Sequence, residues 1–174
     1  MANTWQAVQA AVTFAANKFM LDVFNSSSST RYIRIYRAYY FNNQTAAITG
    51  VLNVMRVGIS SASTGGTAVT PITMDSSNAT LNANTTAGHN RTVTSSSVLR
   101  TLLTSPDEAT VTTLDWDALA TLVPFAEIWN AGYGDTNIQP VTLRASESRG
   151  FYIQSVTQTV GNADFEIMFT DAGS

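Results

Sequence analysis

The chain has few side chains that could carry out chemistry, and its single histidine, His89, is the first of them. His89 lies in the polar stretch NTTAGHNRT, and serines are common in the chain, so a Ser-His-Asp triad is one interpretation. The sequence contains no Gly-x-Ser-x-Gly segment, in which a nucleophilic serine sits on a sharp turn between a strand and a helix. We therefore interpret His89 as an ordinary surface histidine in a loop.

Two pairs of carboxylates are the other candidates for catalysis: Asp107 with Glu108, and Asp115 with Asp117. General acid and base catalysis needs two carboxylates in different environments on either side of a cleft, and neighbours in sequence do not show such a placement. The first pair follows Pro106 and is typical of a turn. The second pair is typical of the first turn of a helix, where acids favour the positive end of the helix dipole.

Patterns that bind a metal or a cofactor are weak in this sequence. The stretch NAGYGDTN at 130–137 is similar to calcium-binding loops, in which closely spaced oxygen ligands need glycine to bend the chain, but Asp135 is its only acid. The chain has no cysteine and no glycine-rich phosphate loop. We expect no metal, no cofactor and no enzymatic activity. A glycan hydrolase that uses Asp115, Asp117 or Asp135 is the enzymatic alternative.

The segment RYIRIYRAYYF at 31–41 combines three arginines with five aromatic residues. Such mixing is typical of a groove that binds nucleic acid, where bases stack on aromatic rings beside cations. Alternation along a strand instead divides the segment into two faces. One face has Ile33, Ile35, Tyr39 and Phe41 with Arg31 and Arg37, and the other has Tyr32, Arg34, Tyr36 and Tyr40. We expect the first face to be buried, which leaves Arg34 between tyrosines on an outer sheet surface or subunit contact.

Charge is distributed unevenly along the chain. Residues 23–74 contain four arginines and no acid, whereas residues 75–174 contain eleven acids and four arginines. The whole chain has a formal net charge of −3 and a pI near 4.9, whereas a nucleic-acid-binding protein is usually basic. The asymmetry predicts a basic element beside an acidic one, within one subunit or between subunits. We expect neither direct nucleic-acid binding nor a membrane partner.

Most of the chain is predicted to form β-strands, because only 12% of its residues are charged and Ser, Thr and Asn are very common. The clearest strand is ADFEIMFT, in which Phe165, Ile167 and Phe169 share one face. RGFYIQSVTQTV precedes it, and the connecting GNA predicts a hairpin. Further strands are predicted at 31–41, at GVLNVMRVGIS and at PVTLRA. Residues 60–97 are expected to form long polar loops with short edge strands.

Two segments have helical spacing of apolar residues. DWDALATLV, which begins at Asp115 and is followed by Pro124, predicts a short helix. Residues 1–12 are expected to form an exposed N-terminal arm or short helix with Trp5, and residues 13–174 a single β-sandwich domain. The predicted fold class is all-β: an antiparallel β-sandwich, jelly-roll-like, with one short helix. Another Greek-key order of strands would give the same pattern.

Several segments of the sequence resemble segments of a known group of proteins. They are FNNQTAAITGVLNVMRV, STGGTAVTP, LVPFAEIWNAGYGDTNIQPVTLRASESRGFYI and FEIMFT, and they cover most of the chain from about residue 30 onward. In these segments the chain resembles small β-rich virion structural proteins of bacterial viruses. The resemblance implies a subunit of a particle, such as a capsid cement or decoration protein, a minor head protein or a small jelly-roll coat protein.

We therefore expect a non-enzymatic structural protein that oligomerises and binds or forms the viral capsid. Its partners are then copies of itself and neighbouring capsid proteins. Because MANTWQAVQAAVTF lacks the features of a secretory signal, we expect the protein to be made in the host cytoplasm and to reside in the virion. The candidate subunit contacts are Trp5, Tyr32, Arg34, Tyr36 and Arg37. The alternative function is a tail-associated carbohydrate-binding module of the same fold, with Trp129 and Tyr133 as an aromatic platform.

Overall fold

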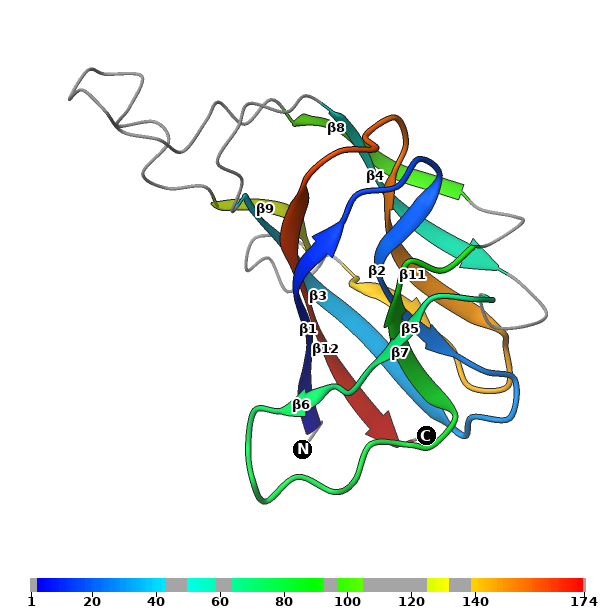
Figure 1. Ribbon diagram of the computed structural model, residues 1–174. Coiled ribbons are helices and arrows are strands. Elements are labelled where there is room, and N and C mark those ends of the chain that lie inside the picture. The colour runs from blue at the N-terminus through cyan, green and yellow to red at the C-terminus, as the bar shows by residue number, and fades with distance from the viewer. Residues whose placement is uncertain are drawn as a thin grey trace.

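The computed structural model describes residues 3–42, 50–58, 64–92, 97–104, 125–131 and 139–173. All the secondary structure of these residues is β-strand, arranged in two antiparallel sheets that pack against each other (Figure 1). The predicted all-β antiparallel sandwich is therefore confirmed. The helix predicted at 115–123 lies outside the described residues, and the jelly-roll order of the strands stays a prediction.

Within the described ranges, each sheet has six strands. Sheet A has the order β10-β3-β12-β1-β6, and β9 also pairs with β3. Sheet A comprises β1 (Asn3–Thr13), β3 (Arg31–Asn42), β6 (Ile72–Thr73), β9 (Phe125–Asn130), β10 (Val141–Leu143) and β12 (Asn162–Gly173). Sheet B has the order β5-β7-β2-β11-β4-β8. Sheet B comprises β2 (Lys18–Asn25), β4 (Gly50–Gly58), β5 (Thr67–Val69), β7 (Thr85–His89), β8 (Ser97–Thr104) and β11 (Arg149–Ser155).

The chain changes sheet between several consecutive strands, including β1 to β2, β2 to β3, β3 to β4 and β11 to β12. The hairpin predicted between the last two strands is therefore wrong. β11 pairs with β2 and β4, whereas β12 pairs with β1 and β3. Alternation shows which face of a strand is buried, but it does not show on which side of the core that strand lies.

The N-terminal residues form a strand, so the arm or short helix expected at 1–12 is wrong. β1 lies between β12 and β6 in sheet A, and Trp5 is only 7% exposed because it faces the core. The register with β12 moves from Gln9 directly to Val12, and Ala11 in this bulge has a φ of 52°. The bulge turns Val12 back to the core. A strand that bulges in this way imitates the spacing of a helix in sequence.

The hydrophobic core fills the space between the sheets. β12 contributes Phe165, Ile167 and Phe169, which are fully buried and confirm the predicted apolar face of this strand. Phe151 and Ile153 of β11 are fully buried on the opposite side of the same core. Full burial of such a side chain stabilises the folded state by about 1.5–3 kcal/mol. β12 and β11 therefore join the two sheets across the core from the middle of each sheet.

A buried ion pair lies inside sheet B, where β2 meets the end of β7. Arg91 Nη1 donates to Asp22 Oδ1 over 3.1 Å, and Arg91 Nη2 donates to the carbonyl oxygen of Ala87 over 3.1 Å. Gly88 leaves the space that the guanidinium fills, since a Cβ there would lie 2.2 Å from its atoms. The pair holds in place the chain just after β7, at Arg91.

Candidate functional site

Strand β3, which carries the arginine and tyrosine segment, runs through sheet A with β12 on one side and β9 and β10 on the other. Ile33 and Ile35 are fully buried, as the alternation predicts. The register with β12 then steps from Ile35–Phe169 to Arg37–Met168, so Tyr36 is an extra residue and forms a β-bulge.

The bulge reverses the alternation beyond this point. Ala38 is fully buried and Tyr40 is 5% exposed, whereas Phe41 is only partly buried. The prediction that Phe41 faces the core and Tyr40 faces outward is therefore wrong. Aromatic residues occupy both parities of the segment, so the apolar pattern alone could not reveal the change of face.

The same bulge decides which arginines share a surface. Arg34 and Arg37 lie on opposite faces of a regular strand, but the extra Tyr36 places both of them on the outer face of sheet A. Four of the candidate contact residues thus come together on this face: Tyr32, Arg34, Tyr36 and Arg37. The fifth, Trp5, faces the core and is not part of this surface.

Neighbouring strands complete this surface, which we call the outer face. Its residues on the other strands of sheet A follow from the strand registers: Gln6, Val8, Glu127, Asn130, Thr142, Asp164, Glu166, Met168 and Thr170. On β3 itself they are Tyr32, Arg34, Tyr36, Arg37, Tyr39 and Phe41. Asp164 Oδ1 accepts a hydrogen bond from the backbone N–H of Ala11 over 2.6 Å. Sequence reasoning missed the members outside β3, because only the pairing of strands places them beside the arginines.

Arg37 has partners within the chain. Its Nη1 donates to Tyr39 Oη over 3.2 Å, and this bond is the main reason that the pKa of the guanidinium is raised. Glu127 adds a smaller attraction in the same direction. Asn130 Nδ2 donates to both carboxylate oxygens of Glu127 over 2.9 Å, which fixes that carboxylate beside Arg37.

Arg34 and Glu166 are the two charged residues of the outer face that have no such partners. In the described part of the chain, neither side chain makes a hydrogen bond or an ion pair. Arg34 is exposed and lies opposite Thr170, whereas Glu166 is partly exposed and lies opposite Tyr39. The four residues from Thr170 to Glu166 span about 13 Å along β12. The sheet itself therefore keeps these opposite charges too far apart to pair within one chain.

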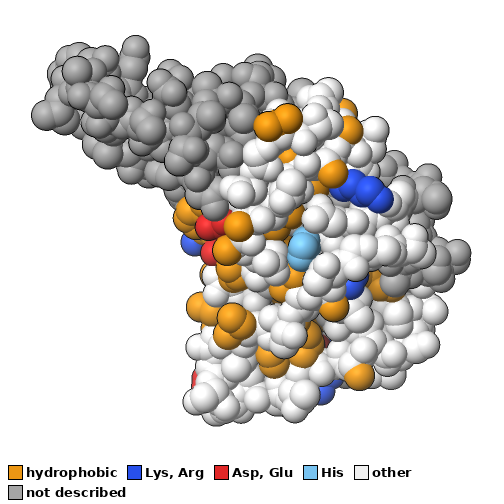
Figure 2. Space-filling model, viewed as in Figure 1, with side chains coloured by type: hydrophobic (Ala, Val, Ile, Leu, Met, Phe, Trp, Pro, Cys, Tyr) orange, Lys and Arg blue, Asp and Glu red, His pale blue; other side chains and the backbone are white. Residues whose placement is uncertain are grey.

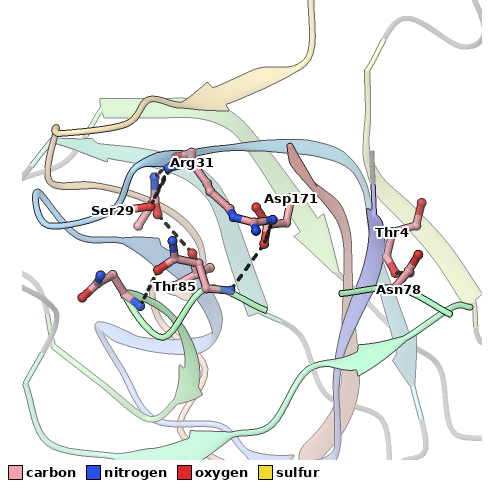
Figure 3. Close-up of polar contacts among 9 residues, drawn as sticks. Thr4, Ser29, Arg31, Asn78, Thr85 and Asp171 are labelled. Carbon is pink, nitrogen blue, oxygen red and sulfur yellow. Dashed lines mark hydrogen bonds and ion pairs between the residues drawn. The ribbon is translucent and has the colours of Figure 1, made fainter. Parts of the chain in front are cut away.

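The remaining arginine of the segment, Arg31, points inward at the end of the sandwich. Its Nη1 lies 3.4 Å from Asp171 Oδ2, and Figure 3 shows the side chain of β3 reaching toward the acid on β12. Asp171 Oδ2 also accepts a hydrogen bond from the backbone N–H of Asn82 over 3.4 Å. For Arg31, the predicted meeting of the basic segment with the acidic remainder is thus confirmed within one subunit.

Exposed hydrophobic side chains lie at the β6 edge of sheet A. Val8, Ile72 and Met74 are 39%, 60% and 53% exposed. Val8 belongs to the outer face, and Ile72 is paired with Gln6 of that face, so the exposed hydrophobic side chains continue from the outer face to its edge. Figure 2 shows hydrophobic side chains over the lower left of the molecule, the part that holds β1 and β6 in Figure 1.

The residues considered for catalysis do not form a site in the part of the chain that the structure describes. His89 is the last residue of β7, so the prediction that it lies in a loop is wrong. Burial, aided by the charge of Arg91, lowers the pKa of His89 below its usual value of 6.5. Asp107, Glu108, Asp115, Asp117 and Asp135 lie outside the described residues.

Trp129, considered as a platform for sugar, packs toward the interior. Its ring centroid is 6.0 Å from that of Phe151 on sheet B, with an interplanar angle of 58°. A second bulge in β9 causes this orientation, because the register with β3 steps from Trp129 to Glu127 and leaves Ile128 unpaired. Trp129 is thus partly buried against the core, and the carbohydrate-binding alternative stays a prediction. Its proposed companion, Tyr133, lies outside the described residues.

In the described ranges, no three His, Cys, Asp or Glu side chains are grouped closely enough to hold a metal ion. The same ranges contain no helix of the length and apolar character needed to span a membrane. Comparison of the chain with models of protein families, with characterised proteins and with solved structures gives no match.

Proposed function

We propose that this chain is a non-enzymatic structural protein of a virion, which assembles with copies of itself and with neighbouring capsid proteins. The observation that carries the proposal is the outer face of sheet A. This face combines exposed arginines, carboxylates and aromatic residues on the central strands of a sheet, and two of its opposite charges are unpaired. Mixed surfaces of this kind, with aromatic and arginine side chains at the centre, are typical of protein–protein contacts.

The resemblance to small virion proteins of bacterial viruses supports the same function. Viral capsid domains are commonly jelly rolls made of two packed sheets, so a jelly-roll order of the strands belongs to this proposal. A contact between subunits suits the outer face better than a contact with nucleic acid, because its two arginines are accompanied by Glu127 and Glu166.

The proposal predicts that Arg34→Glu impairs assembly. Particles of the virus that encodes this chain, assembled without it, would be mixed with purified wild-type or variant protein, and binding measured by co-sedimentation. We expect the variant to bind about tenfold more weakly or worse, because reversing one charge places like charges together at the contact.

Lys18→Glu is the matched control, since it makes the same change of charge on sheet B. Lys18 Nζ donates to Thr92 Oγ1 over 2.6 Å at the surface, a bond whose loss costs little. Binding of the control should equal that of the wild type. The proposal fails if wild-type protein does not bind the particles, or if Arg34→Glu lowers affinity for DNA while particle binding is unchanged.

A further inference from the structure

We propose that the occupant of the outer face is a second copy of the same chain, bound about a twofold axis that brings Arg34 of each copy to Glu166 of the other. This inference rests on the proposed function, because it names the partner of the surface described there. The argument starts from the two unpaired charges, which have opposite signs and lie on adjacent strands, β3 and β12.

The spacing of these charges fits a twofold contact. Arg34 lies opposite Thr170 and Glu166 lies opposite Tyr39, with the Arg37–Met168 pair between the two rows. Suppose that the twofold axis runs perpendicular to the strands, in the plane of the interface and through the Arg37–Met168 pair. This axis places the Glu166–Tyr39 pair of one copy over the Thr170–Arg34 pair of the other. Because the contact is isologous, the same match forms twice. The charges that one sheet holds about 13 Å apart are then brought together by its partner.

The middle of this contact is suited to a subunit interface. Met168 lies at the axis, and its flexible thioether side chain fits irregular apolar surfaces. Arg37, also near the axis, is balanced within each copy by its contacts with Tyr39 and the charge of Glu127. Each copy therefore brings to the interface one unpaired cation and one unpaired anion, and these are complementary only when two copies meet face to face.

The size of the face is sufficient for a stable dimer. β3 and β12 are each 12 residues long, which corresponds to about 40 Å of strand. The five strand positions of sheet A span roughly 20 Å across. The face thus measures roughly 800 Å², the area that each partner buries in an interface of standard size.

An exchange of charges tests this arrangement. Arg34→Glu and Glu166→Arg would be prepared separately and together in one chain, and the dimer dissociation constant measured by sedimentation equilibrium. Each single variant should raise the dissociation constant by about tenfold or more, because it places like charges opposite each other twice. The double variant R34E/E166R should dimerise within about threefold of the wild type, since every facing pair again has opposite signs.

Mixing the two single variants adds a second test that does not depend on the double variant. A heterodimer of Arg34→Glu with Glu166→Arg has opposite charges at both contacts, so it should form although neither variant forms a homodimer of normal strength. Lys18→Glu should dimerise like the wild type. Circular dichroism would verify that each variant is folded.

The outcomes separate this inference from the proposed function. A wild-type chain that binds particles but remains monomeric, or single variants that are not rescued by the exchange, would overturn the twofold contact and leave the virion function standing. A chain that dimerises with the expected rescue but does not bind particles would support the twofold contact and overturn the virion function.

Discussion

Tyr40 shows how one bulge changes the environment of a single side chain from solvent to the core. The extra Tyr36 turns Tyr40 into the core, where its ring packs on Phe165 at a centroid distance of 5.6 Å. Its hydroxyl is buried and has no hydrogen-bond partner among the described residues. This burial raises the pKa of Tyr40 from 10.0 to about 12. The ring of Tyr40 thus packs well, whereas its buried hydroxyl lacks a hydrogen bond among the described residues.

Tyr40→Phe is therefore expected to stabilise the protein. The variant keeps the ring and removes the unpaired hydroxyl, so the free energy of unfolding at neutral pH should rise by about 1 kcal/mol. Urea denaturation of both proteins measures this change. A loss of 1 kcal/mol or more would show that the hydroxyl has a partner that stabilises the fold.

The alkaline pH dependence of the same pair of proteins gives an independent check. The unfolded phenol ionises near its ordinary pKa of 10.0 and the folded one only near 12. The unfolded state therefore binds fewer protons over this interval, so the contribution of Tyr40 to the stability of the wild type should be constant below pH 10 and fall between pH 10 and 12. Tyr40→Phe should lack this part of the alkaline loss.

At the scale of the strand, the bulge in β3 predicts which deletions are tolerated. Without Tyr36, the residues on either side already alternate correctly, because Ile35 pairs with Phe169 and Arg37 with Met168. Deletion of Tyr36 should therefore preserve the sheet. It should cost about 1–2 kcal/mol, chiefly from the lost bond that the Ala131 N–H donates to the Tyr36 carbonyl.

Deletion of Ala38 is the matched control. It removes one residue from the same strand, but it forces either Arg37 into the buried position of Ala38 or Tyr40 out of the core. Cooperative thermal unfolding, followed by circular dichroism, should survive the first deletion and be lost or strongly weakened by the second. Equal damage from both deletions would contradict the register described here.

The bulges also explain which strands and buried faces can be predicted from the sequence alone. Strands with one regular apolar face, such as β12, are predictable because Phe165, Ile167 and Phe169 follow a simple period of two. Where a bulge interrupts that period, as in β1 and β3, the sequence suggests a helix or assigns side chains to the wrong face. The local cost of a bulge is small, and tertiary pairing decides where it occurs.

The outer face likewise contains some residues that the sequence predicts and others that it does not. Arg34 and the tyrosines around it could be identified from composition and alternation within one segment. Glu166 and Glu127 could not, because they come from the far end of the chain and reach the arginines only through strand pairing. The placement of Arg37 beside Arg34 depends on one inserted residue, which no periodicity in the segment indicates.

At the scale of the whole molecule, a dimer through sheet A couples assembly to stability. Because only folded chains dimerise, the midpoint of thermal unfolding should rise with protein concentration. For a chain of 174 residues, each additional kcal/mol of stabilisation corresponds to about 2–4 °C. Differential scanning calorimetry at several concentrations should show this rise for the wild type and for R34E/E166R, and a much smaller one for Arg34→Glu. A midpoint that is independent of concentration in all three proteins contradicts the coupling.

The position of the chain ends carries a further consequence for the proposed dimer. Asn3 and Asp171 are paired neighbours on β1 and β12, so both ends of the described chain emerge at one pole of the sandwich (Figure 1). A twofold axis perpendicular to the strands reverses the strand direction between the two copies. The pole that holds the chain ends therefore lies at opposite ends of the dimer in the two copies. A peptide or fluorophore fused at either terminus would then project from the two opposite tips of the dimer, clear of the buried face. The same fold would thus offer two separate attachment points for cargo.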